Sequence, residues 1–100
     1  MYVGRNLSYA QIVILNKMND FYVYVLVCSD NSLYIGITKD VQNRLQQHNL
    51  GRGSKYVKTR TPASLLYHEG PYTRSQALKL EYQYKQLSRK EKLLKFVKDY

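Results

Sequence analysis

The feature that most constrains the fold is an apolar run at positions 21–28, FYVYVLVC, which is rich in aromatic and β-branched residues. Such residues favour a β-strand because their side chains pack well on a pleated surface. Asp30-Asn31-Ser32 has the composition of a turn, and residues 33–37 form a second strand-like run. The sequence therefore predicts a β-hairpin.

The region after the hairpin alternates helical and extended patterns. Thr38-Lys39-Asp40 can cap a helix over residues 41–49, and the glycines within 50–54 end it. A basic loop is expected over residues 55–62. A third strand is expected over residues 65–69. Gly70-Pro71 is expected to end it, because glycine and proline commonly interrupt strands and helices.

Two capping boxes, which begin at Thr73 and Ser88, predict helices over residues 74–87 and from Arg89 to about residue 100. The predicted order of elements is ββαβαα. A three-stranded sheet with helices packed against it would bury the apolar face of each element. The fold class is therefore α+β, a small three-stranded sheet flanked by helices.

Residues 1–20 differ from the rest because they show no sustained period, and we interpret them as a flexible N-terminal leader before a single domain over residues 21–100. Met18 is an alternative start. Cys28 is the single cysteine and is expected to be a core thiol, which fits a reducing compartment. No signal peptide or membrane span is recognisable, so a soluble, cytoplasmic protein is expected.

The chain is strongly basic, with 16 Lys and Arg against 7 Asp and Glu and a net charge of +9. Such a surface attracts polyanions. Nucleic acid is the first candidate partner, an anionic membrane the second and acidic proteins the third, and charge for solubility alone is the simpler alternative. The predicted basic loop interleaves Lys55, Lys58 and Arg60 with Tyr56, which favours phosphate contacts, whereas the basic run of the last helix favours a solvated face.

Carboxylates are scarce, which narrows the choice of ligands for a hard cation such as Mg²⁺. Asp30 is explained by a turn and Asp40 by a helix cap. Glu81 lies in the middle of a predicted helix beside apolar residues and could face the sheet. The alternative is a solvated Glu81 that pairs with Lys85 four residues later.

Arg44 and His48 are four residues apart and share one face of a helix. Together they suit a phosphodiester, because arginine binds phosphate oxygens and histidine carries a proton near neutral pH. The alternative is two surface residues near a helix C-terminus. Tyr24 and Tyr34 lie on the two strands of the hairpin, either for cross-strand packing or as phenols that exchange a proton near a metal.

Taken in order, these residues resemble the motifs of the GIY-YIG nuclease superfamily. Tyr22-Val23-Tyr24 stands for the first motif with its tyrosine kept, and Tyr34-Ile35-Gly36 is the second motif intact. Arg44, His48 and Glu81 complete the order. Residues 21–98 are most similar to the small, stand-alone, single-domain branch of YazA/YhbQ-like proteins.

The resemblance implies an antiparallel sheet and a metal-dependent endonuclease that hydrolyses phosphodiester bonds in nucleic acid, DNA first, with selection by substrate structure and a role in DNA repair. Glu81 would bind one Mg²⁺ or Mn²⁺. Tyr24, Tyr34 or a metal-bound hydroxide would take a proton from water. Arg44 would stabilise charge on the phosphoryl group, and His48 would orient a phenol or shuttle a proton. The alternatives are a non-catalytic binding module and a nuclease subunit that needs a protein partner for targeting.

Within this resemblance, Ile35 and Gly36 have structural roles in the second motif, with Gly36 allowing a close approach of backbone or phosphate. Residues of the basic loop would line the groove that binds nucleic acid: Lys55, Tyr56, Lys58 and Arg60.

Overall fold

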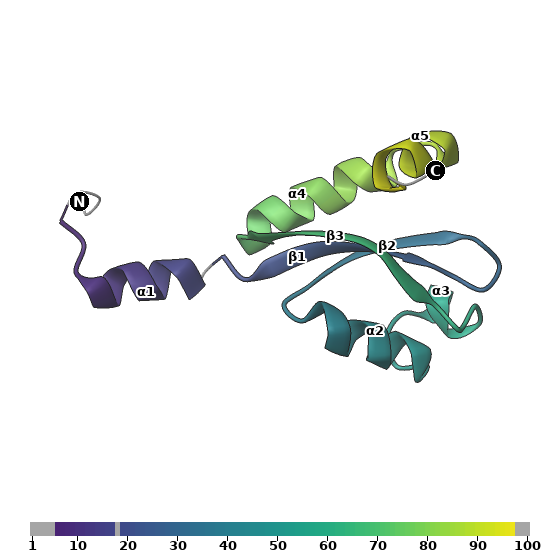
Figure 1. Ribbon diagram of the computed structural model, residues 1–100, viewed down its shortest axis with the longest axis horizontal. Helices are drawn as coiled ribbons and strands as arrows, with labels where there is room; N and C mark the ends of the chain where they lie inside the picture. Colours follow the sequence, from purple (N-terminus) through teal and green to yellow (C-terminus); the bar gives the residue numbers. More distant parts are fainter. Residues whose placement is uncertain (1–5, 18, 98–100) are drawn as a thin grey trace.

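The computed structural model describes residues 6–17 and 19–97 (Figure 1). Its helices and strands follow in the order α1 (Tyr9–Lys17), β1 (Phe21–Val27), β2 (Leu33–Thr38), α2 (Val41–Asn49), α3 (Lys55–Lys58), β3 (Ser64–Tyr72), α4 (Arg74–Lys85) and α5 (Arg89–Phe96).

The sheet has three antiparallel strands in the order β2-β1-β3, which confirms the predicted fold class. β1 is the central strand because its apolar run pairs on both sides. Tyr24 faces Gly36 on β2 and His68 on β3. This register brings the two predicted motifs side by side.

Alternate side chains of β1 enter two separate cores, because successive residues of a strand point to opposite faces. Val23 and Val25 pack on the side of α4 and α5, whereas Tyr24, Leu26 and Cys28 pack on the side of α2 and α3. Figure 1 shows these two pairs of helices on opposite faces of the sheet. A strand covered on both faces accounts for the continuous apolar run, and the buried Cys28 is the predicted core thiol.

The third strand is longer than predicted, because β3 continues through Gly70-Pro71 to Tyr72. Gly70 has a φ of +139°, and a Cβ there would lie 2.7 Å from the carbonyl oxygen of Phe21. A register shift between Phe21 and Val23 restores pairing at Phe21 and Tyr72. β3 is an edge strand, where a proline is tolerated because it needs no ladder donor. The prediction that Gly70-Pro71 ends the strand was wrong.

The helices also differ from the prediction at their ends. α4 ends at Lys85 because the chain is extended again at Ser88, which caps α5. α5 ends at Phe96 because Val97 is extended, and residues 98–100 lie outside the described residues. The predicted basic loop begins with α3, a short helix that the Ser54 side chain caps by accepting from the Val57 N–H at 3.1 Å.

The predicted leader contains α1, whose first turn is closed by reciprocal hydrogen bonds between Ser8 and Gln11. This pair is a capping box that the sequence analysis missed. Figure 1 shows α1 beyond the end of the sheet. Over residues 6–17 and 19–97, no helix has both the length and the apolar character needed to cross a bilayer.

The core beneath α4 contains a carboxylate that holds three tyrosines. Glu69 on β3 accepts hydrogen bonds from the hydroxyls of Tyr67 at 2.7 Å, Tyr72 at 2.5 Å and Tyr84 at 2.6 Å. Burial raises the pKa of Glu69, but the hydrogen bonds from Tyr72, Tyr84 and Tyr67 outweigh it, so the pKa lies below its usual 4.5. Because Tyr84 lies on α4, Glu69 fastens that helix to β3.

We expect Glu69→Gln to lower the free energy of unfolding by about 1–3 kcal/mol at neutral pH, because an amide is a weaker acceptor and adds unpartnered N–H groups. A lowered folded-state pKa stabilises the protein above the unfolded pKa, and this contribution is lost as pH falls through the folded value. The difference between wild type and variant should therefore shrink as the pH falls below 4.5. Urea titrations at pH values from neutral to below 4.5 measure this difference in the free energy of unfolding, with Asp20→Asn as the control. Equal stability of wild type and Glu69→Gln at neutral pH would contradict the role of Glu69.

Candidate active site

A buried hydrogen bond joins the first motif to α2. The Tyr24 hydroxyl lies 2.8 Å from Nε2 of His48. Tyr24 is 1% exposed and His48 is fully buried. A buried polar pair is stable only when its groups find partners, so this contact fixes β1 and α2 relative to each other.

Two glycines make room for the pair. A Cβ at Gly36 would lie 2.6 Å from the Tyr24 hydroxyl oxygen, and a Cβ at Gly53 would lie 2.1 Å from Nδ1 of His48. Gly36 was expected to allow a close approach, and the group that approaches it is the Tyr24 phenol. Ile35 of the same motif is buried in the core on the opposite face of the sheet.

The backbone determines which nitrogen of His48 carries the proton. The Ser54 N–H lies 3.3 Å from Nδ1, and a backbone N–H can only donate. Nδ1 is therefore the acceptor, and neutral His48 carries its proton on Nε2 and donates it to the Tyr24 hydroxyl oxygen. Burial first, and then the charge of Arg44, lower the pKa of His48 below 6.5, which keeps the ring neutral.

Arg44 approaches the same oxygen from the previous turn of α2. Its Nε donates to the Tyr24 hydroxyl at 3.4 Å. Among the described residues, no hydrogen bond engages the two Nη groups, which leaves them for phosphate oxygens. Burial raises the pKa of Tyr24 to about 12, against the lowering effect of the Arg44 hydrogen bond. Tyr24 is therefore a neutral phenol that accepts from both residues of α2.

Tyr34 is the accessible phenol of the site. Its ring centroid lies 5.1 Å from that of His48 and 6.3 Å from that of Tyr24, and the side chain is half-buried. No hydrogen bond to its hydroxyl is found within residues 6–17 and 19–97. Of the two tyrosines, Tyr34 is therefore the more exposed, because Tyr24 is buried.

Glu81 lies on α4 and influences this cluster through its charge. Its charge raises the pKa of Tyr24, so the carboxylate acts on the site electrostatically. It also pairs with Lys85 at 3.4 Å, as the alternative interpretation expected, and its side chain is 21% exposed. In the part of the chain that the structure describes, no group of three or more His, Cys, Asp or Glu side chains gathers. A single, partly exposed carboxylate fits Mg²⁺, which keeps several waters and takes phosphate oxygens as ligands.

Comparisons with known proteins identify the family of this chain. The family model of the GIY-YIG catalytic domain matches residues 20–94. The chain belongs to the GIY-YIG family. It is 50% identical over 76 residues to a UPF0213 protein of Bacillus velezensis, and the aligned residues cover 76% of this chain and 77% of the relative. It is 49% identical over 76 residues to a UPF0213 protein of Staphylococcus aureus, which covers 76% of this chain and 93% of the relative.

Two solution NMR structures are also similar. The UPF0213 protein BH0048 of Bacillus halodurans is 39% identical, with a TM-score of 0.48 over 77% of this chain and 84% of that chain. The protein EF2693 of E. faecalis is 42% identical, with a TM-score of 0.49 over 74% and 81%. The GIY-YIG match suggests a nuclease, and the names of these relatives state no substrate, metal or activity.

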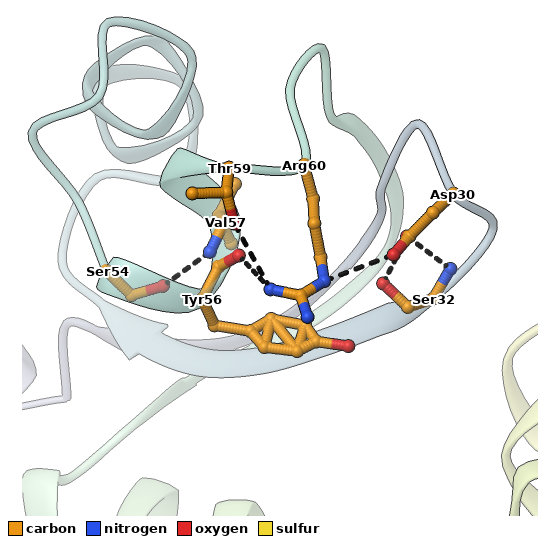
Figure 2. Close-up of polar contacts among 7 residues, drawn as sticks. All are labelled: Asp30, Ser32, Ser54, Tyr56, Val57, Thr59 and Arg60. Carbon is orange, nitrogen blue, oxygen red and sulfur yellow. Dashed lines mark hydrogen bonds and ion pairs between the residues drawn. The ribbon is translucent and has the colours of Figure 1, made fainter.

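Of the predicted basic segment, Tyr56 lies next to Tyr34 of the candidate site, and Arg60 lies next to Tyr56. Lys55 and Lys58 are exposed on α3. Tyr56 stacks on Tyr34, with ring centroids 6.2 Å apart and an interplanar angle of 29°. The guanidinium carbon of Arg60 lies 3.8 Å from the centroid of the Tyr56 ring (Figure 2). A series of contacts therefore links His48 to Tyr34 and Tyr34 to Tyr56 through their rings, and Tyr56 to Arg60 through a cation–π contact.

Several residues that position this GIY-YIG site were missed by sequence reasoning. Ser54 fixes the His48 tautomer through its backbone, which no side-chain pattern reveals. The Asn49 side chain exchanges two hydrogen bonds with the backbone of Ala63, at 2.7 and 2.9 Å, and closes the connection from α2 to β3. Asp30 was interpreted as a turn residue, yet it also pairs with Arg60 at 3.1 Å.

We expect His48 to be the neutral Nε2–H tautomer at about pH 7, because burial and the charge of Arg44 lower the pKa of its ring below 6.5. Protonation would place an Nδ1–H against the Ser54 N–H, so a lowered pKa stabilises the fold above 6.5, and the contribution is lost as pH falls through the folded value. Long-range ¹H–¹⁵N spectra identify the tautomer, with exposed His68 as internal reference. An Nδ1–H tautomer, or an imidazolium at this pH, would refute the assignment.

Proposed function

We propose that this protein is a metal-dependent endonuclease that hydrolyses phosphodiester bonds in nucleic acid, with DNA as its substrate. The observation that carries the proposal is the cluster of Tyr24, Arg44 and His48 beneath an accessible Tyr34 in a GIY-YIG domain. The cluster fixes an arginine with unengaged donors next to a reachable phenol. This pairing suits a reaction in which water is deprotonated while negative charge grows on a phosphoryl group.

The exposures of the two tyrosines divide their roles. Tyr34 would orient the attacking water and take its proton, because it is only partly buried. Tyr24 is 1% exposed, so it would act on the reaction through Arg44. Arg44 would offer its Nη groups to the phosphoryl oxygens while its Nε stays on Tyr24. His48 is a positioning residue, because a fully buried ring does not contact substrate.

Glu81 would hold one Mg²⁺ or Mn²⁺, exchanging its surface pairing with Lys85 for the cation. When bound, such a cation polarises the phosphate and makes a nearby water more acidic. An exposed pair four residues apart on a helix is worth only about 0.3–0.5 kcal/mol, so the exchange costs little. The exposed Lys55 and Lys58 on α3 support binding of the phosphate backbone.

The central test measures cleavage of labelled single-stranded, duplex and branched DNA by wild type, Tyr34→Phe and Tyr82→Phe. Tyr34→Phe should lower kcat by roughly 10²–10⁴-fold with little change in KM, since a general base acts on the chemical step. Tyr82→Phe is the matched control, because it removes a hydroxyl from a side chain that is 68% exposed on α4. The three substrates also test selection by DNA structure.

Three outcomes would redirect the proposal. Equal activity of Tyr34→Phe and wild type would exclude Tyr34 as the base. Binding that weakens with salt but never leads to cleavage would favour a binding module. Cleavage that appears only with an added protein would favour a subunit that depends on a partner.

We expect Glu81→Gln to abolish metal-dependent cleavage and to weaken Mn²⁺ binding, whereas Lys85→Met should retain both because it leaves the carboxylate in place. Paramagnetic broadening of amide signals by Mn²⁺ measures binding without any substrate. If the two variants lose activity to the same extent, the ion pair and not a metal ligand explains the role of Glu81.

A further inference from the structure

We propose that Asp30, in the turn between β1 and β2, is a positioning residue of the nucleic-acid surface, which holds the Arg60 guanidinium against Tyr56 so that its remaining N–H groups face a phosphate of the bound strand. This inference rests on the proposed function. It adds a role for a residue that turn chemistry alone had explained.

Arg60 is held from three directions (Figure 2). Its Nε donates to Oδ2 of Asp30 at 3.1 Å, and its Nη1 donates to the Tyr56 carbonyl oxygen at 2.8 Å and to the Thr59 hydroxyl at 3.4 Å. Its plane lies over the Tyr56 ring. Across residues 6–17 and 19–97, no hydrogen bond engages Nη2. Nε and Nη1 therefore fix the orientation of the guanidinium, and Nη2 is left to bind a phosphate.

Asp30 is itself fixed before it binds Arg60. Its Oδ1 accepts from the Ser32 N–H at 3.0 Å and from the Ser32 hydroxyl at 2.5 Å. These hydrogen bonds lower the pKa of Asp30, so the carboxylate is charged at neutral pH. The Ser29 N–H also donates to the Arg60 carbonyl oxygen at 2.9 Å. The turn and the end of the basic segment are thus joined through backbone and side chain.

Stability is a weak explanation for this pair. The Asp30 side chain is 49% exposed and that of Arg60 is 35% exposed, and solvent-exposed ion pairs contribute little to the free energy of unfolding. A carboxylate on a surface that binds a polyanion also repels the ligand. A positioning role explains its presence better, because a guanidinium held in one orientation loses less freedom when it meets a phosphate.

The position of Arg60 ties this role to the candidate active site. Arg60 covers Tyr56, Tyr56 stacks on Tyr34, and Tyr34 is the accessible phenol. A strand whose phosphate meets Nη2 of Arg60 would pass beside Tyr34. Asp30 would therefore set where the strand lies relative to the phenol.

The test compares Asp30→Asn with Asp20→Asn. Each variant removes one negative charge, and each carboxylate belongs to an exposed ion pair. Asp20 and Asp30 lie at opposite ends of β1, and Asp20 pairs with Lys39 at 3.9 Å. Fluorescence anisotropy with a labelled single-stranded oligonucleotide, without divalent metal, gives Kd. Charge alone should make both variants bind tighter. Lost positioning should instead weaken Asp30→Asn by about 2–10-fold relative to Asp20→Asn.

Arg60→Lys supplies a second variant, because lysine keeps the charge but cannot stack flat while holding two acceptors. When Arg60 is already lysine, the Asp30→Asn and Asp20→Asn substitutions should change Kd by the same factor. The Arg60 Nε–H signal in NMR spectra should be sharp in wild type and averaged in Asp30→Asn. Asparagine can still accept from Ser32, and circular dichroism verifies that the turn variant folds.

The outcomes separate this inference from the proposed function. If wild type binds but Asp30→Asn tightens binding as much as Asp20→Asn does, Asp30 is a turn residue only and the function stands. If wild type binds no nucleic acid, both ideas are overturned. Weaker binding by Asp30→Asn that disappears in the Arg60→Lys background establishes the positioning role.

Discussion

The hydrogen bond between Tyr24 and His48 is the interaction on which the arrangement of the site depends. It buries two polar rings between β1 and α2, and burial without partners would cost several kcal/mol, on the order of 1–3 for each group. Glycines at positions 36 and 53 are required because any side chain there would collide with these rings. Ser54 completes the hydrogen bonding of His48. The two motifs, α2 and the loop after it are thereby locked into one geometry.

This rigid pair leaves the exposed groups free for chemistry. The Tyr24 hydroxyl oxygen accepts hydrogen bonds from His48 and Arg44 and keeps its own proton. The bond from Nε orients the Arg44 guanidinium and leaves its two Nη groups without hydrogen bonds to the described residues. Tyr34 packs against the same ring of His48 but remains half-exposed. A fixed support with accessible groups at its edge is what preorganised stabilisation of a transition state needs.

Local signals made much of this predictable. The apolar run of β1 predicted the central hairpin, and the capping boxes predicted where α4 and α5 begin. The resemblance to the GIY-YIG motifs, rather than a local signal, predicted that Tyr24, Tyr34, Arg44 and His48 belong to one site. What escaped prediction depends on contacts between distant segments. β3 passes Gly70-Pro71 because Phe21 shifts its register, and Asp30 holds Arg60 across thirty positions. A sequence shows which residues can cap or turn, but not which distant partner they also bind.

The distribution of carboxylates connects the basic surface to the proposed metal. In a chain of net charge +9, each carboxylate in the described residues has a specific task in the fold, as a cap, an ion pair or the acceptor of tyrosines: Asp20, Asp30, Asp40, Glu69, Glu81 and Glu91. Glu81 differs because its partner lies on its own helix and neither fixes a turn nor joins two elements. Losing that contact disturbs no other part of the fold. Under the proposed function, Glu81 is therefore the carboxylate that would exchange its partner for a cation while the rest of the structure stays in place.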